Sequence, residues 1–313
     1  MRQANGIDDI DRPGDMTGNS IASDTVVGRD MRVEDAARAM RGRLSERYGA
    51  GEAEAMVRLI FHHLKGWSAA QLFMHGGDVL SDYMTSKISG FMRRIIDEAE
   101  PIQYVLGEGR FYGMDLKVTP AVLVPRPETA ELVDMVVDRY GETPDLQVLD
   151  ACTGSGAIAI ALARNLRFPD VTALDVSAAA LDVARENARK LRAGVEFVEA
   201  DLMKWMPDRE SLDIIVSNPP YVDESERASM DANVLKWEPE MALFVPDADP
   251  LVFYRRIAEI GAEGLKRGGE MYMEINPRHA DELKAMLEGR GFTDVEIRND
   301  SFGKRRFAVC GKA

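Results

Sequence analysis

The feature that most constrains the fold is an alternation of short apolar runs with longer amphipathic segments, from Leu146 to the end of the chain. Short apolar runs predict strands, and an apolar period near 3.6 residues predicts helices. This alternation is typical of a mostly parallel sheet covered by helices on both faces. We therefore predict a Rossmann-like α/β domain over residues 126–313. Its seven strands are expected at residues 147–150, 171–175, 195–198, 212–216, 270–275, 295–297 and 306–309, and its helices at 127–140, 157–165, 178–191, 251–265 and 281–290.

The chain before this domain has a different pattern. Residues 1–30 are rich in Asp and Gly with little apolar periodicity, so we expect a disordered tail. Residues 31–100 carry apolar residues at helical spacing and predict a small helical bundle, in which Ser68 caps a short helix. Residues 101–125 combine turn glycines with β-branched residues and predict a hairpin linker. The expected apolar positions of the bundle include Val33, Ala36, Ala37, Met40, Met56, Leu59, Ile60, Leu64, Tyr83, Met84, Ile88, Met92 and Ile95.

Composition excludes several classes of protein. The chain has 313 residues, a net charge of −14 and two cysteines, which lack the spacing of metal ligands. We therefore expect no metal, and a reducing, cytoplasmic environment. The sequence shows neither a membrane-spanning apolar run nor a secretion signal, so no membrane partner is expected. The acidic balance argues against direct binding of nucleic acid and permits a basic protein partner.

A small-residue turn follows the first predicted strand of the α/β domain. Small residues let the backbone approach a ligand, and the N–H groups of the next helix point toward it. Asp175 ends the second strand, where a carboxylate can accept hydrogen bonds from both hydroxyls of a ribose. The turn lacks a Walker Lys and the spaced dinucleotide glycines, so a phosphate-free cofactor, S-adenosylmethionine, fits best. The candidate residues of the turn are Asp150, Cys152, Thr153, Gly154, Ser155 and Gly156.

Two further strand ends should lie on the same edge of the sheet. Asp201 and Leu202 follow the third strand; Asp201 can accept the amino group of adenine or only cap a turn. Asn218-Pro219-Pro220-Tyr221 follows the fourth strand. Because a proline stiffens itself and the residue before it, the oxygens of Asn218 and Pro219 form two fixed acceptors beside an aromatic ring. They suit a flat NH2 group, either an amide or the exocyclic amine of a base.

These motifs together resemble one family, the release-factor glutamine N5-methyltransferases, also called HemK or PrmC. The resemblance spans about residues 33–310 and includes Glu100 to Gly107 and the pair Glu238-Pro239. Asn-Pro-Pro-Tyr alone also occurs in DNA adenine methyltransferases, so it fixes only the shape of the acceptor. The stretches that carry the resemblance are Pro125-Arg126-Pro127-Glu128-Thr129, Thr153-Gly154-Ser155-Gly156-Ala157, Asp175 and Asn218-Pro219-Pro220-Tyr221.

The resemblance implies a two-domain enzyme. Its helical domain, residues 31–100, would help to dock a class I peptide-chain release factor. Its class I methyltransferase domain would transfer a methyl group from S-adenosylmethionine, giving S-adenosylhomocysteine, to the glutamine amide of the Gly-Gly-Gln motif of that factor. One departure is Cys152, where the family usually has Gly. The alternatives are a ribosomal-protein glutamine methyltransferase, a nucleic-acid adenine methyltransferase and a helical adaptor without activity.

For the reaction we expect Asn218 Oδ1 and the Pro219 carbonyl to accept the two amide hydrogens of the substrate. We expect Tyr221 to line one side of the acceptor pocket. Alignment of the reacting atoms should contribute more than either hydrogen bond. No general base is required, because the proton becomes acidic after methylation and can leave to water.

Overall fold

The computed structural model of the chain describes residues 26–313. Most of the tail expected to be disordered, residues 1–30, lies outside the described residues; of the last five, Val27 is fully buried. The chain divides into two compact units, Met1–Gly90 and Phe91–Ala313. In the part of the chain that is described, no helix has both the length and the apolar character needed to span a bilayer.

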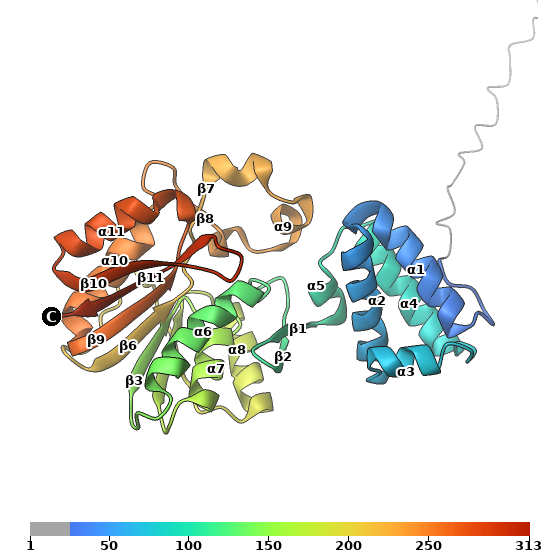
Figure 1. Cartoon of the computed structure of the whole chain (residues 1–313), viewed down its shortest axis with the longest axis horizontal. Helices are drawn as coiled ribbons and strands as arrows, with labels where there is room; N and C mark the ends of the chain where they lie inside the picture. The colour runs from blue at the N-terminus through green and yellow to red at the C-terminus, as the bar shows by residue number, and fades with distance from the viewer. Residues whose placement is uncertain (1–25) are drawn as a thin grey trace, which may run out of the picture. The chain divides into compact units, whose positions relative to one another are not determined.

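The first unit is helical, as the apolar spacing predicted. Its helices are α1 (Val33–Tyr48), α2 (Ala50–Lys65), α3 (Ala69–Met74) and α4 (Asp82–Ile96), whose last turns continue into the second unit (Figure 1). Ser68 caps α3 through a capping box with Gln71, so the predicted cap is confirmed.

Two side chains predicted to lie on the buried face of this bundle are exposed. Leu59 in α2 is 40% exposed and Tyr83 in the first turn of α4 is 64% exposed. The buried stripe of α2 includes the predicted Met56 and Ile60, and adds Ala53, Val57 and Phe61. The predicted face was too wide, because a helix of a small bundle buries a stripe and not every apolar residue on one side.

The second unit begins with a short helix and a hairpin. α5 (Ile102–Leu106) precedes the antiparallel strands β1 (Glu108–Phe111) and β2 (Met114–Lys117). The hairpin is confirmed, although it is shorter than the predicted 101–125. Arg94 holds α5 in place: it pairs with the buried Glu100 and donates to the carbonyl oxygens of Tyr104 and Val105.

A seven-stranded sheet dominates the second unit, and the predicted fold class is confirmed. Four strands, β3 to β6, agree with the predicted positions to within one residue at each end. β9 begins earlier than expected, and β10 and β11 are longer than predicted. The order is β10-β11-β9-β6-β3-β4-β5, in which β11 is antiparallel to both neighbours and the remaining pairs are parallel. The strands are β3 (Gln147–Ala151), β4 (Asp170–Asp175), β5 (Glu196–Glu199), β6 (Leu212–Ser217), β9 (Leu265–Glu274), β10 (Phe292–Asn299) and β11 (Arg305–Lys312).

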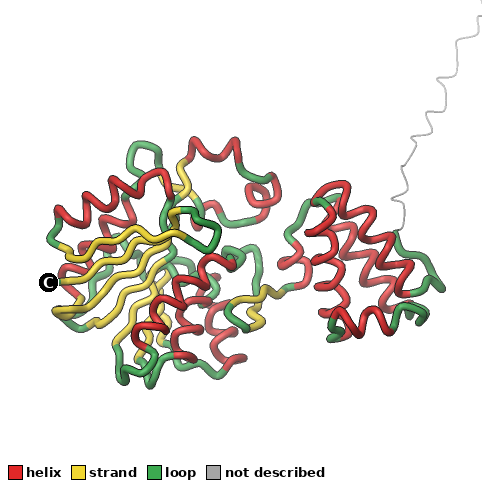
Figure 2. Tube along the Cα trace, in the orientation of Figure 1, coloured by secondary structure: helices red, strands yellow, loops and turns green. Residues whose placement is uncertain are grey.

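Helices cover both faces of this sheet, as the ribbon and tube views show (Figures 1 and 2). One core lies between the sheet and α6 (Pro127–Tyr140), α7 (Ala157–Asn165) and α8 (Ala178–Leu191). The other lies under α10 (Val252–Gly264) and α11 (Ala280–Gly289). The near-continuous apolar runs of the central strands follow from this burial on two sides.

The strand order reverses at β3. The chain runs outward from β3 to β4 and β5, and then returns to place β6 on the other side of β3. In open α/β sheets a ligand crevice forms at such a point, beyond the carboxyl ends of the strands. The turn after β3 and the Asn-Pro-Pro-Tyr stretch after β6 therefore lie next to each other.

The segment from Val222 to Val245 contains elements that the sequence did not predict. Two short parallel strands, β7 (Val222–Asp223) and β8 (Phe244–Val245), enclose η1 (Glu224–Ser229), α9 (Ala232–Trp237) and η2 (Glu240–Ala242). Each element is too short to give a periodic pattern of its own.

Candidate active site

A pocket lies at the point where the strand order reverses. Its empty volume is about 1080 Å³, which includes open solvent at the mouth. Of the predicted site residues, it is lined by Cys152, Thr153, Gly154, Ser155, Asp175, Asp201, Leu202, Asn218 and Pro220. Asp150, Gly156, Pro219 and Tyr221 do not line it; they lie behind or beside it.

Asp150 supports the turn from inside the sheet. Its Oδ2 accepts hydrogen bonds from Thr153 Oγ1 at 2.6 Å and from the backbone N–H of Ala159 at 3.0 Å. Its Oδ1 is buried and finds no hydrogen-bond partner among the described residues. Burial raises the pKa of Asp150 to about 7, against the effect of its two hydrogen bonds and with a contribution from the charge of Asp175.

The backbone of the turn is left-handed at three positions. Cys152 has φ +66°, Gly154 has φ +55° and Gly156 has φ +80°. This conformation favours glycine, so Cys152 carries a side chain where the backbone conformation would suit glycine. A Cβ at Gly154 would meet no protein atom within 4 Å, whereas at Gly156 it would lie 3.0 Å from Ile160 Cδ1. The turn therefore leaves open space on its pocket side at Gly154.

Asp175 closes the second strand and faces the turn. Oδ2 accepts the backbone N–H of Gly154 at 2.8 Å, and Oδ1 accepts that of Ser177 at 2.9 Å. Each oxygen therefore keeps acceptor capacity for a ligand hydroxyl. The pKa of Asp175 is raised, first by burial, against these backbone hydrogen bonds. Ser177 caps α8 by accepting the N–H of Ala180.

Asp201 and Leu202 lie beyond β5. Asp201 Oδ1 accepts the N–H of Met203 at 3.0 Å, and its Oδ2 pairs with Lys204 at 3.0 Å. The hydrogen bond with Lys204 is the main cause of the lowered pKa of Asp201. Leu202 is buried and offers an apolar surface beside Val176 and Phe253. Asp201 therefore caps a turn and also lines the pocket.

Asn218 belongs to a chain of hydrogen bonds that reaches into the core. Its Nδ2 donates to Thr129 Oγ1 at 3.3 Å, and Thr129 Oγ1 donates to Glu274 Oε2 at 2.6 Å. The other carboxylate oxygen of Glu274, Oε1, accepts a hydrogen bond from the hydroxyl of Tyr221 at 3.0 Å. Asn218 Oδ1 accepts no hydrogen bond from residues 26–313, so it is available to a substrate.

Sequence reasoning missed Thr129 and Glu274 as site residues. Thr129 was counted only as part of a motif that begins a helix, and Glu274 only as part of a strand. A signal was present: Glu274 interrupts an apolar run, Tyr272-Met273-Glu274-Ile275, in a strand predicted to be buried. A buried carboxylate is rare unless it is paired or has a function.

Arg126 pairs with the buried Glu238 at 2.6 Å, and Glu238 also accepts the N–H of Val124. This ion pair joins the Pro-Arg-Pro-Glu-Thr stretch to Glu238-Pro239, two parts of the sequence pattern more than a hundred residues apart. Arg126 lines this pocket and also a second pocket, which shares Asn218 with the first and adds Tyr221, Val234 and Leu243.

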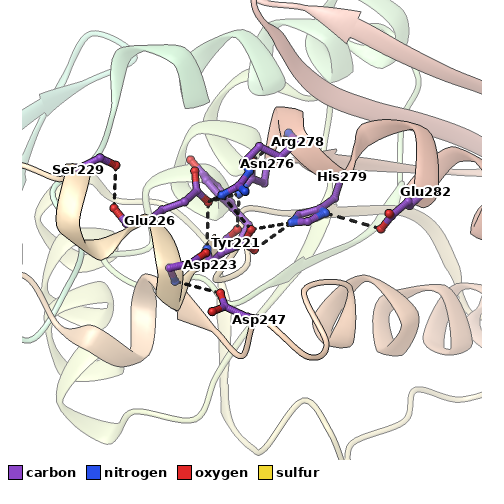
Figure 3. Close-up of polar contacts among 10 residues, drawn as sticks. Tyr221, Asp223, Glu226, Ser229, Asp247, Asn276, Arg278, His279 and Glu282 are labelled. Atoms are coloured by element: carbon purple, nitrogen blue, oxygen red, sulfur yellow. Dashed lines mark hydrogen bonds and ion pairs between the residues drawn. The ribbon is translucent and has the colours of Figure 1, made fainter.

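The segment after Tyr221 is held by polar side chains from the end of β9 (Figure 3). Asn276 Nδ2 donates to the carbonyl oxygen of Tyr221 at 3.0 Å and to Glu226 at 2.6 Å. The ring of His279 lies 2.8 Å from the buried carboxylate of Asp223. Tyr221 is therefore held at both ends, at its hydroxyl by Glu274 and at its backbone by Asn276.

The sheet and this pocket define a class I, S-adenosylmethionine-dependent methyltransferase. Residues 35–107 match the PrmC N-terminal domain, and residues 148–237 match a methyltransferase domain. A release factor glutamine methyltransferase of Bacteroides thetaiotaomicron is 44% identical over 275 residues, which cover 87% of this chain and 98% of that protein. The chain belongs to the release factor glutamine methyltransferase family, and the resemblance inferred from the motifs is confirmed.

Other relatives agree with this assignment. The release factor glutamine methyltransferase of Streptococcus pneumoniae is 43% identical, over 83% of this chain and 92% of its own. The release factor glutamine methyltransferase of Neisseria gonorrhoeae is 35% identical, over 81% of this chain and 91% of its own. Among solved structures, a methyltransferase from Pyrococcus furiosus matches 74% of this chain and all of its own, with a TM-score of 0.48 and 17% identity.

Proposed function

We propose that this chain transfers a methyl group from S-adenosylmethionine to the side-chain amide nitrogen of the glutamine in the Gly-Gly-Gln motif of class I peptide-chain release factors. The family assignment supports a release factor as the substrate. The amide as the reacting group is supported by Asn218, whose Oδ1 is directed away from its protein partner and is available as an acceptor.

The residues of the pocket fit this donor. The open space at Gly154 lets the backbone lie close to a ligand, and Asp175 keeps acceptor capacity for two ribose hydroxyls. Leu202, Val176 and Phe253 provide apolar surface for a purine. When bound, S-adenosylmethionine would supply an electrophilic methyl group on a sulfonium.

The protein's own contribution is to hold the amide nitrogen. Asn218 Oδ1 and the carbonyl of Pro219 would accept the two amide hydrogens, which fixes the NH2 plane and raises electron density on nitrogen. Each hydrogen bond contributes about 0.5–1.5 kcal/mol net. Alignment of the reacting atoms can contribute up to roughly 7–11 kcal/mol, so positioning is the larger effect.

The observation that carries this proposal is the presence of Asp175 and Asn218 in the lining of one pocket. One residue fits the ribose of the donor and the other fits an amide acceptor. A pocket that bound only a nucleoside would not require the free acceptor oxygen of Asn218.

The test uses the full-length protein with labelled S-adenosylmethionine and, in separate reactions, a class I release factor, ribosomal protein and DNA. Label should enter only the release factor, at the glutamine of its Gly-Gly-Gln motif. Asn218→Ala should reduce turnover strongly with little change in donor affinity, and Asp175→Ala should weaken donor binding in calorimetry. Labelling of ribosomal protein or DNA instead would refute the proposed substrate.

A further inference from the structure

A buried carboxylate at the end of β9 lies behind the acceptor motif. Glu274 is 1% exposed, yet it is not part of the pocket lining. Burying a carboxylate costs free energy unless hydrogen bonds compensate. Here each carboxylate oxygen accepts a hydrogen bond from a hydroxyl group, one from Thr129 and one from Tyr221. Thr129 contacts Asn218, the first residue of the Asn-Pro-Pro-Tyr motif, and Tyr221 is its last residue.

The direction of these hydrogen bonds determines which way the amide of Asn218 points. A hydroxyl has one proton to donate, and a carboxylate can only accept. Thr129 must therefore give its proton to Glu274, and it can only accept from Asn218. The NH2 end of Asn218 then faces Thr129, and Oδ1 faces the place of the substrate.

The opposite orientation would fit the same space, because the oxygen and the NH2 group of an amide are similar in size. Without the carboxylate, Thr129 could donate its proton to Asn218 Oδ1. The amide would then turn. The NH2 groups of Asn218 and of the substrate would face each other, and the substrate amide would lose Asn218 Oδ1 as a hydrogen-bond acceptor.

The groups around Glu274 act on its charge in both directions, and the two hydroxyl donors and Arg306 are those that favour the carboxylate as an acceptor. Arg306 on β11 is the nearby positive charge, Glu128 on α6 is the opposing negative one, and Tyr254 on α10 donates to the backbone oxygen of Glu274. Burial raises the pKa of Glu274, against the hydrogen bonds of Thr129 and Tyr221 and the charge of Arg306.

We propose that Glu274 is a positioning residue that acts through Thr129 to orient the Asn218 amide with its oxygen toward the substrate. This inference rests on the proposed methylation of a glutamine amide. Glu274 is not in the pocket lining, and Thr129 lines the pocket beside Asn218. Their effect is on which face of Asn218 the substrate meets.

The first test compares Thr129→Val with Thr129→Ser. Valine keeps the volume but removes the hydroxyl, and serine keeps the hydroxyl. Thr129→Val should lower kcat for release-factor methylation about tenfold, which corresponds to about 1.4 kcal/mol of activation free energy, with unchanged donor affinity. Thr129→Ser should remain close to the unaltered protein. If Thr129→Val keeps full kcat, or if both variants lose it equally, the inference is overturned.

A double-mutant cycle separates orientation from general packing. If Thr129 acts through Asn218, Thr129→Val should have no further effect on the residual activity of Asn218→Ala. A role in packing alone would lower turnover by the same factor in both backgrounds, and that result would refute the inference.

Glu274→Gln is a second variant, for the case that Thr129→Val does not fold. The glutamine oxygen can accept from Tyr221 while one N–H of its NH2 group donates to Thr129. Thr129 would then donate to Asn218 Oδ1 and turn the amide. We expect the same fall of about tenfold in kcat, with unchanged donor affinity by calorimetry. Full activity of Glu274→Gln would overturn the inference, whereas an inactive unaltered protein would refute the proposed function.

Discussion

At the scale of single residues, Cys152 shows how a backbone conformation determines which side chain is tolerated. Its φ of +66° lies in the left-handed region, which costs a residue with a Cβ about 1–2 kcal/mol. The cysteine nevertheless contacts the core under α10 and α11, so packing of its side chain offsets part of this cost.

We predict that Cys152→Gly is more stable than Cys152→Ala by about 1 kcal/mol. Both variants remove the sulfur, so the difference reports the Cβ atom and the backbone conformation that it disfavours. The control is Ala163→Gly within α7, where glycine should instead lower stability by about 1 kcal/mol. Denaturant unfolding measures each difference. Equal stability of the two Cys152 variants would show that the turn relaxes around any residue.

Asp150 makes stability depend on pH. Its pKa is about 7 in the folded protein and has an ordinary value of 3.8. Between these values the folded state binds more protons than the unfolded state, so stability falls as pH rises, by up to about 1.4 kcal/mol per pH unit. The penalty is absent below the ordinary pKa and complete above the folded one.

We therefore predict that Asp150→Asn gains stability relative to the unaltered protein as pH rises from about 4 to about 7. The Asn oxygen can keep the hydrogen bonds from Thr153 and Ala159 and place its NH2 where Oδ1 has no partner. Denaturant unfolding across this range measures the two slopes. A difference between the proteins that stays constant with pH would contradict the prediction.

At the scale of elements, the two glycines of the turn between β3 and α7 have different surroundings. An added Cβ meets only open space at Gly154, whereas at Gly156 it would press on Ile160 and on Ala184 Cβ at 3.1 Å. Both glycines have positive φ, so both substitutions strain the backbone, and only one also disturbs packing.

We predict that Gly154→Ala weakens donor binding more than it lowers stability, and that Gly156→Ala lowers stability more. The shared backbone strain should cost about 1–2 kcal/mol. Calorimetry with S-adenosylhomocysteine and thermal unfolding of the same two proteins give the comparison. If Gly154→Ala binds as tightly as the unaltered protein, the cofactor does not occupy that side of the turn.

The elements that could be predicted from the sequence are those whose pattern is local. The bounds of α7 and α8 agree with the prediction to the residue. α8 repeats its apolar period over several turns, and α7 is an apolar run between a turn glycine and a polar end. The elements between Val222 and Val245 were missed because they are stabilised by side chains distant in sequence, such as Asn276 and His279.

The same distinction holds for the site. Asp175 and Asn218 could be found because each ends a predicted strand, where ligands of parallel sheets bind. The roles of Thr129 and Glu274 could not, because a hydrogen bond between residues 145 positions apart depends on the order of the strands. That order places β9 next to β6, and the alternation of elements does not specify it.

At the scale of the whole molecule, the active site is assembled from parts of the second unit that are remote along the chain. Cys152 and Asp175 belong to the first half of the sheet domain, Asn218 follows β6, and Phe253 begins α10. Because one ligand would contact all of them, its binding should stabilise these segments together and not singly.

We predict that saturation with S-adenosylhomocysteine slows native-state hydrogen exchange at the turn after β3, at the end of β4 and beyond β6 in parallel. At a ligand concentration of 100 times the Kd, binding adds about 2.7 kcal/mol to the stability of the state that binds. α1 serves as the internal reference, since none of its residues lines the pocket. Asp175→Ala should require more ligand for the same protection. Protection confined to one of the three segments would mean that the ligand does not bridge the strand ends, and that the pocket described here is not the donor site.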